Sequence, residues 1–420
     1  MVAPHLRYPK TLGGLVHQLE LSKALAKRGH EVHLITQNIG PHQKDVDLEN
    51  VQIHEIKLVP LPLVADQIVL LLKTFILILK LNQKYNFSVI HDRGYLLGGA
   101  GTIAATLLRK PVVLQVDDNW FESARYHGKD FPSFFRFLYL ILGMTVAKDW
   151  LQFVILPNVQ RIVAVSRVLE DVICEEWHYP RSKVSVVPNG VNLTRFRPSE
   201  AGNELKRQLK LEKKRVVVFV GEIAPWQGVE CLLRAVAKAV DQFPSIMALI
   251  VGGVSRAHAD YLKQLKSLTN SLGISDHVVF TGVMPPDKIP NIVASAEITV
   301  APFVSSKSGR LVFSPLKIFE YMAAEKAIIA SKVPWIEEIL EHNKTALLVN
   351  PGSAEDLSDA LITLFSNSDM TQSLGRNARL VAENKYGWDK IAIKIEEAYE
   401  TLFKETGKTW KHNNLVGQGS

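Results

Sequence analysis

Two cations and a carboxylate lie within eleven positions of one another in the segment SGRLVFSPLKIFEYMAAEKAIIAS, residues 308–331. They are Arg310, Lys317 and Glu320, and most of the residues around them are apolar. Cations close to the start of a helix suit a phosphate-bearing ligand, because the first N–H groups of a helix also attract anions. The segment therefore predicts a phosphate-binding site, and a solvated surface helix is the alternative.

A second candidate is the pair Gly13 and Gly14, at the point where a first strand is expected to turn into a helix. Without a Cβ atom the backbone can approach a ligand, and the free N–H groups of the helix would face a diphosphate. A simple tight turn is the alternative explanation for this pair.

A third candidate is the acid pair Asp117 and Asp118, at the end of the predicted strand PVVLQVDD. A carboxylate there can orient a hydroxyl group or act as a nucleophile, whereas a strand-end turn needs neither role. No Asp-x-Asp motif lies between a strand and a helix, and no GxGxxG follows a first strand. We therefore predict neither a metal site nor a dinucleotide oxidoreductase.

The composition is that of an ordinary globular protein whose surface favours anionic partners. The 420 residues exceed one usual core, and the formal net charge is +7. This charge is spread along the chain, so we do not predict nucleic-acid binding. Cys174 and Cys231 are the only cysteines, which indicates a reducing, cytoplasmic setting without a disulfide framework.

Two apolar segments bear on membrane contact. Residues 61–84 predict a buried amphipathic helix with a polar stripe at Asp66, Lys73 and Lys80, and a membrane-lying helix is the alternative. Its uninterrupted apolar runs are far shorter than the roughly twenty residues that span a bilayer. Residues 131–150 begin with crowded aromatic side chains, so they predict either a core helix or an interfacial membrane contact.

Short β-branched strands alternate with helical patterns almost throughout, which is typical of parallel, doubly wound sheets. Strands are expected at 30–36, 87–92, 111–118, 161–166 and 183–190, and again at 216–222, 247–253, 277–282, 298–303, 327–331 and 346–350. The opening residues, MVAPHLRYP, predict the end of a strand that enters a loop.

A charged segment without a strand, residues 192–214, separates the two series and predicts a domain boundary. We expect an N-terminal Rossmann-like domain at 1–195, a C-terminal one at 196–387, a helix at about 388–405 that crosses back to the first domain, and a disordered tail at 407–420. Two such domains would face each other across a cleft at the carboxyl ends of their strands.

Six motifs occur in one order: GGLVHQLELSKALAKRGHEVHLIT, AVSRVLEDVI, VSVVPNGVNLTRFRP, FVGEIAPWQGVECLLRAV, VVFTGVMPPDKIPNIVASAEITVAPF and SPLKIFEYMAAEKAIIAS. Together they resemble the retaining, family-4 glycosyltransferases of GT-B fold. The resemblance covers about residues 10–405. It implies transfer of a sugar from a nucleotide-diphosphate sugar to an acceptor, without a metal or another cofactor.

The resemblance also assigns roles to residues. Glu320 would accept hydrogen bonds from the ribose hydroxyls at the opening of its helix, and Ser314 and Leu316 would lie beside the phosphates. Gly13, Gly14, Gly282 and Val283 would also bind the nucleotide-sugar donor. Asp117, at the position where many members have a histidine, would orient the acceptor hydroxyl or stabilise positive charge on the sugar ring, and Asp118 is the rival candidate for this position.

Two departures from the family pattern concern charge. Many members have an arginine after the strand glycine and a lysine before the next glycine, but here the stretch from Gly221 to Gly228 has Glu222 and Gln227 at those places. Lys317 and Arg310 are the expected substitutes. Many members also have a glutamate that contacts the donor sugar, and Val312 occupies its position here.

The predicted function is therefore sugar transfer by a metal-independent glycosyltransferase of the hexosyl type. The acceptor stays open between a glycan, a lipid-linked sugar and a small metabolite, with peripheral membrane contact as a further expectation. The alternative is a catalytically weak or inactive protein that binds nucleotide sugar as a scaffold. His5 and His17, near the first loop, are expected to be solvated.

Overall fold

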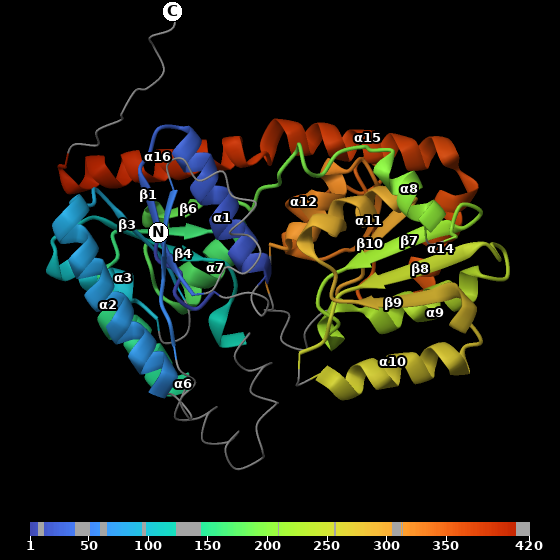
Figure 1. Ribbon diagram of the computed structural model, residues 1–420, viewed down its shortest axis with the longest axis horizontal. Coiled ribbons are helices and arrows are strands. Elements are labelled where there is room, and N and C mark those ends of the chain that lie inside the picture. Colours follow the sequence, from blue (N-terminus) through green and yellow to red (C-terminus); the bar gives the residue numbers. More distant parts are fainter. Residues whose placement is uncertain are drawn as a thin grey trace, which may run out of the picture. The chain divides into compact units, whose positions relative to one another are not determined.

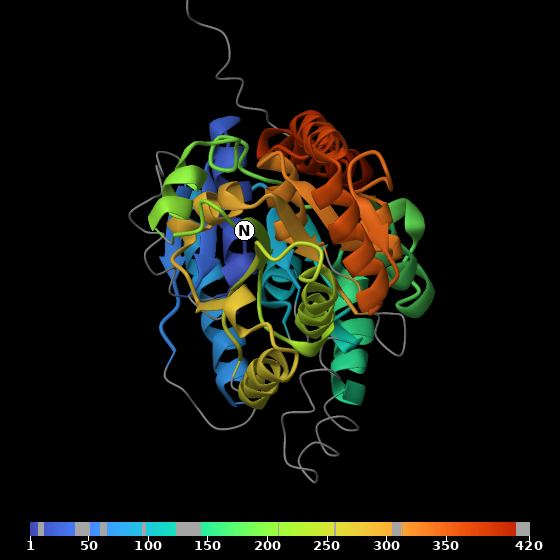
Figure 2. The same ribbon diagram turned by 90° about the vertical axis from the view of Figure 1, so that its right-hand side faces the viewer.

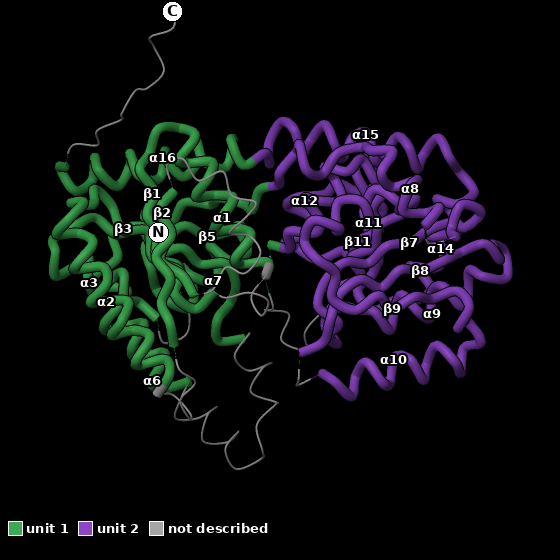
Figure 3. Tube along the Cα trace, in the orientation of Figure 1, with its two compact units in different colours: residues 1–190, 312–314, 388–420 green, residues 191–311, 315–387 purple. Residues whose placement is uncertain are grey.

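The computed structural model describes residues 1–6, 12–37, 51–58, 65–94, 98–122, 144–208, 210–255, 258–304, 312 and 314–408. The chain forms two compact units (Figure 3). Unit 1 comprises residues 1–190, 312–314 and 388–420, and unit 2 comprises residues 191–311 and 315–387.

Unit 1 is built on parallel strands. They are β1 (Val32–Thr36), β2 (Val51–Glu55), β3 (Ile90–Arg93), β4 (Val112–Val116), β5 (Arg161–Ala164) and β6 (Val184–Val186). β1 pairs with β2, and the other four are ordered β3-β4-β5-β6. Val2 bridges both Ile35 and Asp92, so the first residues of the chain lie between β1 and β3.

The helices of unit 1 cover its strands on both sides (Figure 1). They are α1 (Leu12–Lys27), α2 (Ala65–Tyr85), α3 (Ala100–Leu107), α6 (Met144–Asp149), α7 (Arg167–Glu176) and α16 (Trp388–Thr406). On one side α2 and α3 bury Leu70, Ile78 and Ala104 against Ile35 and Ile90. The C-terminal helix α16 packs against α1 and β5. Burial of these aliphatic side chains is the main stabilising contribution to the unit.

Unit 2 contains a six-stranded parallel sheet of order β12-β11-β10-β7-β8-β9. The strands are β7 (Arg215–Val220), β8 (Ile246–Val251), β9 (Val278–Gly282), β10 (Ile298–Ala301), β11 (Ala327–Ser331) and β12 (Leu347–Val349). The order reverses between β7 and β10, because β8 and β9 extend the sheet on one side of β7 whereas β10 to β12 extend it on the other. Such a reversal opens a crevice for ligands at the carboxyl ends of the two strands.

Helices cover both faces of this sheet (Figure 1 and Figure 2). They are α8 (Ala201–Gln208), α9 (Val229–Ala239), α10 (Ala259–Ser271), α11 (Ile289–Ser295), α12 (Leu316–Ala323), α13 (Pro334–Glu337), α14 (Ala354–Ser366) and α15 (Ser368–Lys385). α9 and α14 share one apolar cluster with alternate strand residues, and α8 and α11 share another with the opposite face. Both faces are buried, which explains the continuous apolar runs of the strands.

The predicted strands and the two doubly wound sheets are confirmed. β2 was not predicted, because its sequence VQIHE is short and only Val51 in it is buried. The predicted helix is present as α2 from Ala65, but Ile68, Leu72 and Ile76 point away from the core and are at least half exposed. The predicted polar stripe therefore shares the outer face with aliphatic side chains. Within the described ranges, no helix combines the length and hydropathy needed to cross a bilayer.

Candidate functional site

Lys317 lies in the first turn of α12, and its ammonium group is turned into unit 2 rather than toward water. The residue is only 8% exposed. Its Nζ donates a hydrogen bond of 2.7 Å to Oε1 of Gln227 and lies 4.1 Å from the centre of the Phe219 ring and 5.2 Å from that of Phe303. Phe219 belongs to β7 and Phe303 follows β10, so the cation lies at the two strands between which the sheet order reverses.

The loop after β7 is shaped to admit this lysine. Gly221 has φ +151°, and a Cβ atom there would lie 2.5 Å from Nζ of Lys317. At the other end of the loop, Gly228 has φ +73° and a Cβ would approach the carbonyl oxygen of Pro302 to 1.7 Å. Val304 N–H also donates to the Trp226 carbonyl at 2.9 Å. Glycine is therefore required at both ends of the loop, which packs directly on the residues after β10.

Lys317, which is buried, and Glu320, which is half-buried, influence each other electrostatically, and their pKa shifts are opposite. Burial lowers the pKa of Lys317 to about 7, although Glu320 and Glu222 act in the other direction. Burial likewise raises the pKa of Glu320 to about 7, against the influence of Arg195 and Lys317. A bound anion beside Lys317 would favour its charged form, since an opposite charge nearby stabilises the ammonium.

The prediction that Glu320 opens its helix is wrong. α12 begins at Leu316, after Pro315, and no acidic residue lies in its first turn. Glu320 is the fifth residue and half-buried. Among the first-turn N–H groups, that of Ile318 donates to the carbonyl oxygen of Pro315, whereas those of Leu316 and Lys317 have no preceding helical carbonyl as acceptor.

Gly13 and Gly14 lie in the first turn of α1, in unit 1. The carbonyl oxygen of Gly14 accepts a hydrogen bond of 2.8 Å from Nη1 of Arg93. A Cβ atom on Gly14 would approach Nη2 of Arg93 to 3.0 Å, so a side chain would compete with this guanidinium for space. Arg93 is the last residue of β3.

Asp117 follows β4 directly and pairs with the same arginine. Nε of Arg93 lies 2.5 Å from Oδ2, and the amide of Gln115 donates to Oδ1 at 2.7 Å. Burial on its own raises the pKa of Asp117, but Arg93, followed by His17 and Gln115, brings the pKa below its ordinary value. Asp117 is therefore an ionised carboxylate.

The prediction that His17 is solvated is wrong. His17 is 4% exposed, its Nε2 lies 2.7 Å from the Gln115 amide nitrogen, and its ring packs edge-on against Trp388. Arg93 and Gln115 were not singled out in the sequence. β3 and β4 are buried along almost their whole length, and no pattern in their sequence indicated that Arg93 and Gln115 both contact Asp117.

Two family models match the chain. "Glycosyltransferase Family 4" matches residues 13–195, and "Glycosyl transferases group 1" matches residues 202–381. The chain belongs to glycosyltransferase family 4. An uncharacterised glycosyltransferase of Methanocaldococcus jannaschii is 23% identical over 405 residues, which cover 95% of this chain and 97% of the relative.

Two further proteins similar to this glycosyltransferase have more specific descriptions. The GDP-mannose-dependent alpha-(1-6)-phosphatidylinositol monomannoside mannosyltransferase of Mycobacterium tuberculosis is 29% identical, over 52% of this chain and 56% of the relative. The crystal structure of Anabaena HepE in complex with UDP and glucose superposes with a TM-score of 0.73 at 18% identity, over 95% of this chain and 99% of HepE. The glycosyltransferase thus has the GT-B fold.

The remaining predicted residues of the glycosyltransferase are placed as follows. Ser314 is buried, and its carbonyl oxygen accepts a hydrogen bond of 2.5 Å from Asn189. Gly282 ends β9 with φ +71°, and Val283 beside it is 65% exposed. Val312 is 1% exposed, so it packs in the core. Arg310 and most of residues 131–150 lie outside the described residues, as does the tail from residue 409.

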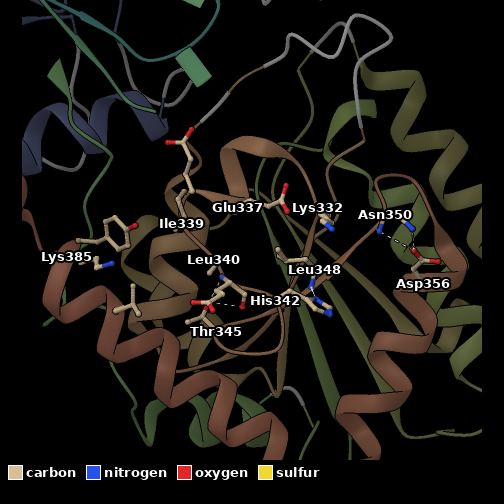
Figure 4. Close-up of a pocket in the computed structure, with 14 residues that line it drawn as sticks. Lys332, Glu337, Ile339, Leu340, His342, Thr345, Leu348, Asn350, Asp356 and Lys385 are labelled. Atoms are coloured by element: carbon tan, nitrogen blue, oxygen red, sulfur yellow. Dashed lines mark hydrogen bonds between the residues drawn. The ribbon is translucent and has the colours of Figure 1, made fainter. Parts of the chain in front are cut away.

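A cavity of about 680 Å³ occurs elsewhere in unit 2 of the glycosyltransferase (Figure 4). Its polar lining includes Lys332, Glu337, Glu341, His342, Asp356 and Lys385. Among the residues that the structure describes, none of the predicted site residues lines it. The ring of His342 is already engaged, because its Nδ1 accepts from the N–H of Leu348 at 3.0 Å.

Proposed function

We propose that this glycosyltransferase moves a sugar from a nucleotide-diphosphate sugar to an acceptor hydroxyl, with retention of the anomeric configuration and without a metal. The observation that carries the proposal is the hydrogen bond from Lys317 to Gln227. It brings a cation to the loop position where many family members have a lysine, at the reversal of strand order.

In this proposal Lys317 neutralises charge on the departing diphosphate. An ammonium group is suited to that role, because stabilisation of the developing negative charge is a large contribution to such reactions. Glu320, once ionised, accepts from the two ribose hydroxyls, and the N–H groups of Leu316 and Lys317 donate to phosphate oxygens. Arg310 would add a second cation.

On the side of unit 1, Gly13 and Gly14 admit a phosphate at the start of α1, and Asp117 accepts from the acceptor hydroxyl. The HepE complex with UDP and glucose supports a nucleotide-sugar donor, since the folds are alike. Gly282 and Val283 are assigned to the donor side on the family resemblance alone.

A donor screen tests this function. UDP-, GDP- and ADP-sugars are incubated with cell-extract acceptors, and release of nucleoside diphosphate is measured with the native chain and with Lys317→Met. We expect release with one donor class, its persistence in EDTA, and at least a hundredfold loss in the variant, the order of a lost electrostatic stabiliser. Nucleotide-sugar binding without release for every donor would instead support the scaffold alternative.

The outer face of α2 supports the further proposal that the acceptor is presented at an anionic lipid surface. Ile68, Leu72 and Ile76 recur every four residues at 58%, 51% and 50% exposure, and Lys73 and Lys80 are exposed beside them. Aliphatic side chains flanked by lysines suit the boundary between headgroups and acyl chains. The free thiols of Cys174 and Cys231 support a cytoplasmic setting for this contact.

Vesicle flotation tests the lipid contact. We expect binding to phosphatidylglycerol vesicles, weaker binding to phosphatidylcholine, and loss of binding in Leu72→Glu/Ile76→Glu. Leu107→Glu is the matched control, because Leu107 is 64% exposed on α3 of the same unit. Equal loss in both variants, or no binding by the native chain, would contradict the proposal.

A further inference from the structure

A continuous set of buried polar contacts surrounds Asp117 in unit 1. Its centre is Gln115, which is 1% exposed. The Gln115 amide nitrogen donates to Oδ1 of Asp117 at 2.7 Å and lies 2.7 Å from Nε2 of His17. Its carbonyl oxygen accepts from Nε2 of Gln18 at 3.1 Å and lies 2.9 Å from Nε2 of His91.

These contacts fix the protons on both imidazoles. An amide nitrogen can only donate, so Nε2 of His17 accepts and the proton of its neutral ring is on Nδ1. An amide oxygen can only accept, so the proton of His91 is on Nε2. Its Nδ1 then accepts from the hydroxyl of Tyr399 at 2.6 Å. Each group in the series has one protonation state that satisfies its neighbours.

The surroundings leave Asp117 and Arg93 as the charged pair of this cluster. Burial lowers the pKa of His17 to about 4 and that of His91 to about 3, so both rings are neutral near pH 7. The groups that act on Asp117 are Arg93 from β3, His17 from α1, Gln115 from β4 and His5 from the loop before α1.

The side chain of Asp117 is more exposed than those of its partners in this cluster. Its side chain retains 18% exposure and that of Arg93 retains 11%, whereas Gln115, His17 and His91 are at most 4% exposed. The guanidinium is held from the other side by the carbonyl of Gly14. The buried members thus constrain the carboxylate of a side chain that is itself partly exposed.

We propose that Arg93 and Gln115 are positioning residues, which hold the Asp117 carboxylate ionised and in one orientation toward the acceptor. This inference rests on the proposed role of Asp117 in sugar transfer. Arg93 contacts one carboxylate oxygen and Gln115 donates to the other. Loss of either partner therefore changes the protonation equilibrium of the carboxylate as well as its orientation.

The experiment compares pH profiles of kcat/KM for Arg93→Met, Arg93→Lys and Gln115→Glu. Without the guanidinium, the acid limb of the profile should move up by about one pH unit or more, the usual effect of an adjacent arginine on an aspartate. Arg93→Lys should keep the acid limb near its native position while kcat falls about tenfold. Lysine retains the positive charge but cannot contact both Asp117 and the Gly14 carbonyl as the guanidinium does. Gln115→Glu should also move the limb upward.

Arg161→Met is the matched control. Arg161 is 4% exposed in β5 and pairs with Glu405 at 2.5 Å, so its loss removes a buried guanidinium elsewhere in unit 1. We expect lower stability and an unchanged limb. An unchanged limb in Arg93→Met as well, with activity lost in proportion to stability, would overturn the inference.

A second measurement separates this inference from the proposed function. The carboxyl of Asp117 is titrated by NMR in the protein labelled with ¹³C-aspartate, and its signal is assigned by its loss in Asp117→Asn. A raised pKa in Arg93→Met supports the positioning role even if no donor is turned over, in which case the proposed function alone fails. An unshifted titration in a folded Arg93→Met variant would overturn the positioning role.

Discussion

At the scale of single residues, Lys317 combines the position proposed for a diphosphate-binding cation with an energetic cost. A buried ammonium with a pKa of about 7 is only about half protonated at neutral pH. Such a group is held in place by rings and one amide oxygen, rather than by a carboxylate in direct contact. We infer that the fold tolerates this cost because the lysine is needed when an anion arrives.

This cost predicts a pH dependence of stability. The unfolded chain retains the Lys317 proton up to its ordinary pKa, whereas the folded chain loses it near pH 7. The unfolded state therefore binds more protons between these values, and stability rises with pH there. The free energy of unfolding of the native chain, minus that of Lys317→Met, should rise by a few kcal/mol from pH 7 to 10, at about 1.4 kcal/mol per pKa unit.

Urea unfolding of both proteins at several pH values provides the comparison. Glu320 contributes in the lower range, since its raised pKa makes stability fall as pH rises toward 7. A difference that is flat between pH 7 and 10 would show that Lys317 is not buried in the folded chain.

Gly221 gives a second prediction at this scale. Gly221→Ala places a Cβ atom 2.5 Å from Nζ of Lys317 at φ +151°. We expect a loss of about 1–3 kcal/mol from backbone strain, together with weaker nucleotide binding because the lysine is displaced. Gly273→Ala is the control, since φ is +70° there and no atom lies within 4 Å of the added Cβ. It should lose stability but bind nucleotide normally, and equal binding by both variants would contradict the account.

At the scale of elements, the strands could be predicted, but the polar contacts between them could not. Apolar runs define most strands of unit 2, because strands buried on both faces are continuously apolar. The edge strand β9 is the exception, since Val279 in it is 41% exposed. The burial of Lys317 depends on Phe219 and Phe303, which are distant in the sequence, and no local pattern links them. The start of α12 was predicted too late, at Glu320. The helix begins directly after Pro315, and no acidic residue lies in its first turn.

The attachment of α16 to α1 carries its own prediction. Glu396 is 3% exposed and pairs with Arg28 at 2.6 Å and with His30 at 2.8 Å. Burial raises its pKa, but these hydrogen bonds leave the pKa below its ordinary value. Glu396→Gln should lower the free energy of unfolding by about 1–3 kcal/mol near pH 7.

The pH dependence of this loss follows from the lowered pKa. The stabilisation is present above the ordinary pKa of a glutamate and disappears as the pH falls through the folded-state value, so the difference between the proteins should shrink in acid. Glu397→Gln, at the next position of the same helix, serves as the control. Thermal unfolding of the three proteins at pH 4 and pH 7 measures the effect, and a difference independent of pH would exclude an ionic origin.

At the scale of the whole molecule, the sequence sufficed for the fold class and for the family. The motifs that carry the resemblance follow the strands of both units, and the structure confirms the GT-B fold. The departures at Glu222 and Gln227 were visible in the sequence, but the way Lys317 reaches Gln227 emerges only when β7 and α12 are brought together. Asp117 was identified as a candidate, whereas its partners Arg93 and Gln115 were not.

The central claim is that Lys317 supplies, at Gln227, the cation that meets a diphosphate. Titration calorimetry tests it with the nucleoside diphosphate that the donor screen identifies and with the corresponding nucleoside as a reference without phosphate. We predict that Lys317→Met weakens diphosphate binding at least tenfold and leaves nucleoside binding unchanged. The double variant Lys317→Met/Gln227→Lys should recover most of the lost diphosphate affinity. Native-like diphosphate affinity in Lys317→Met would contradict the claim.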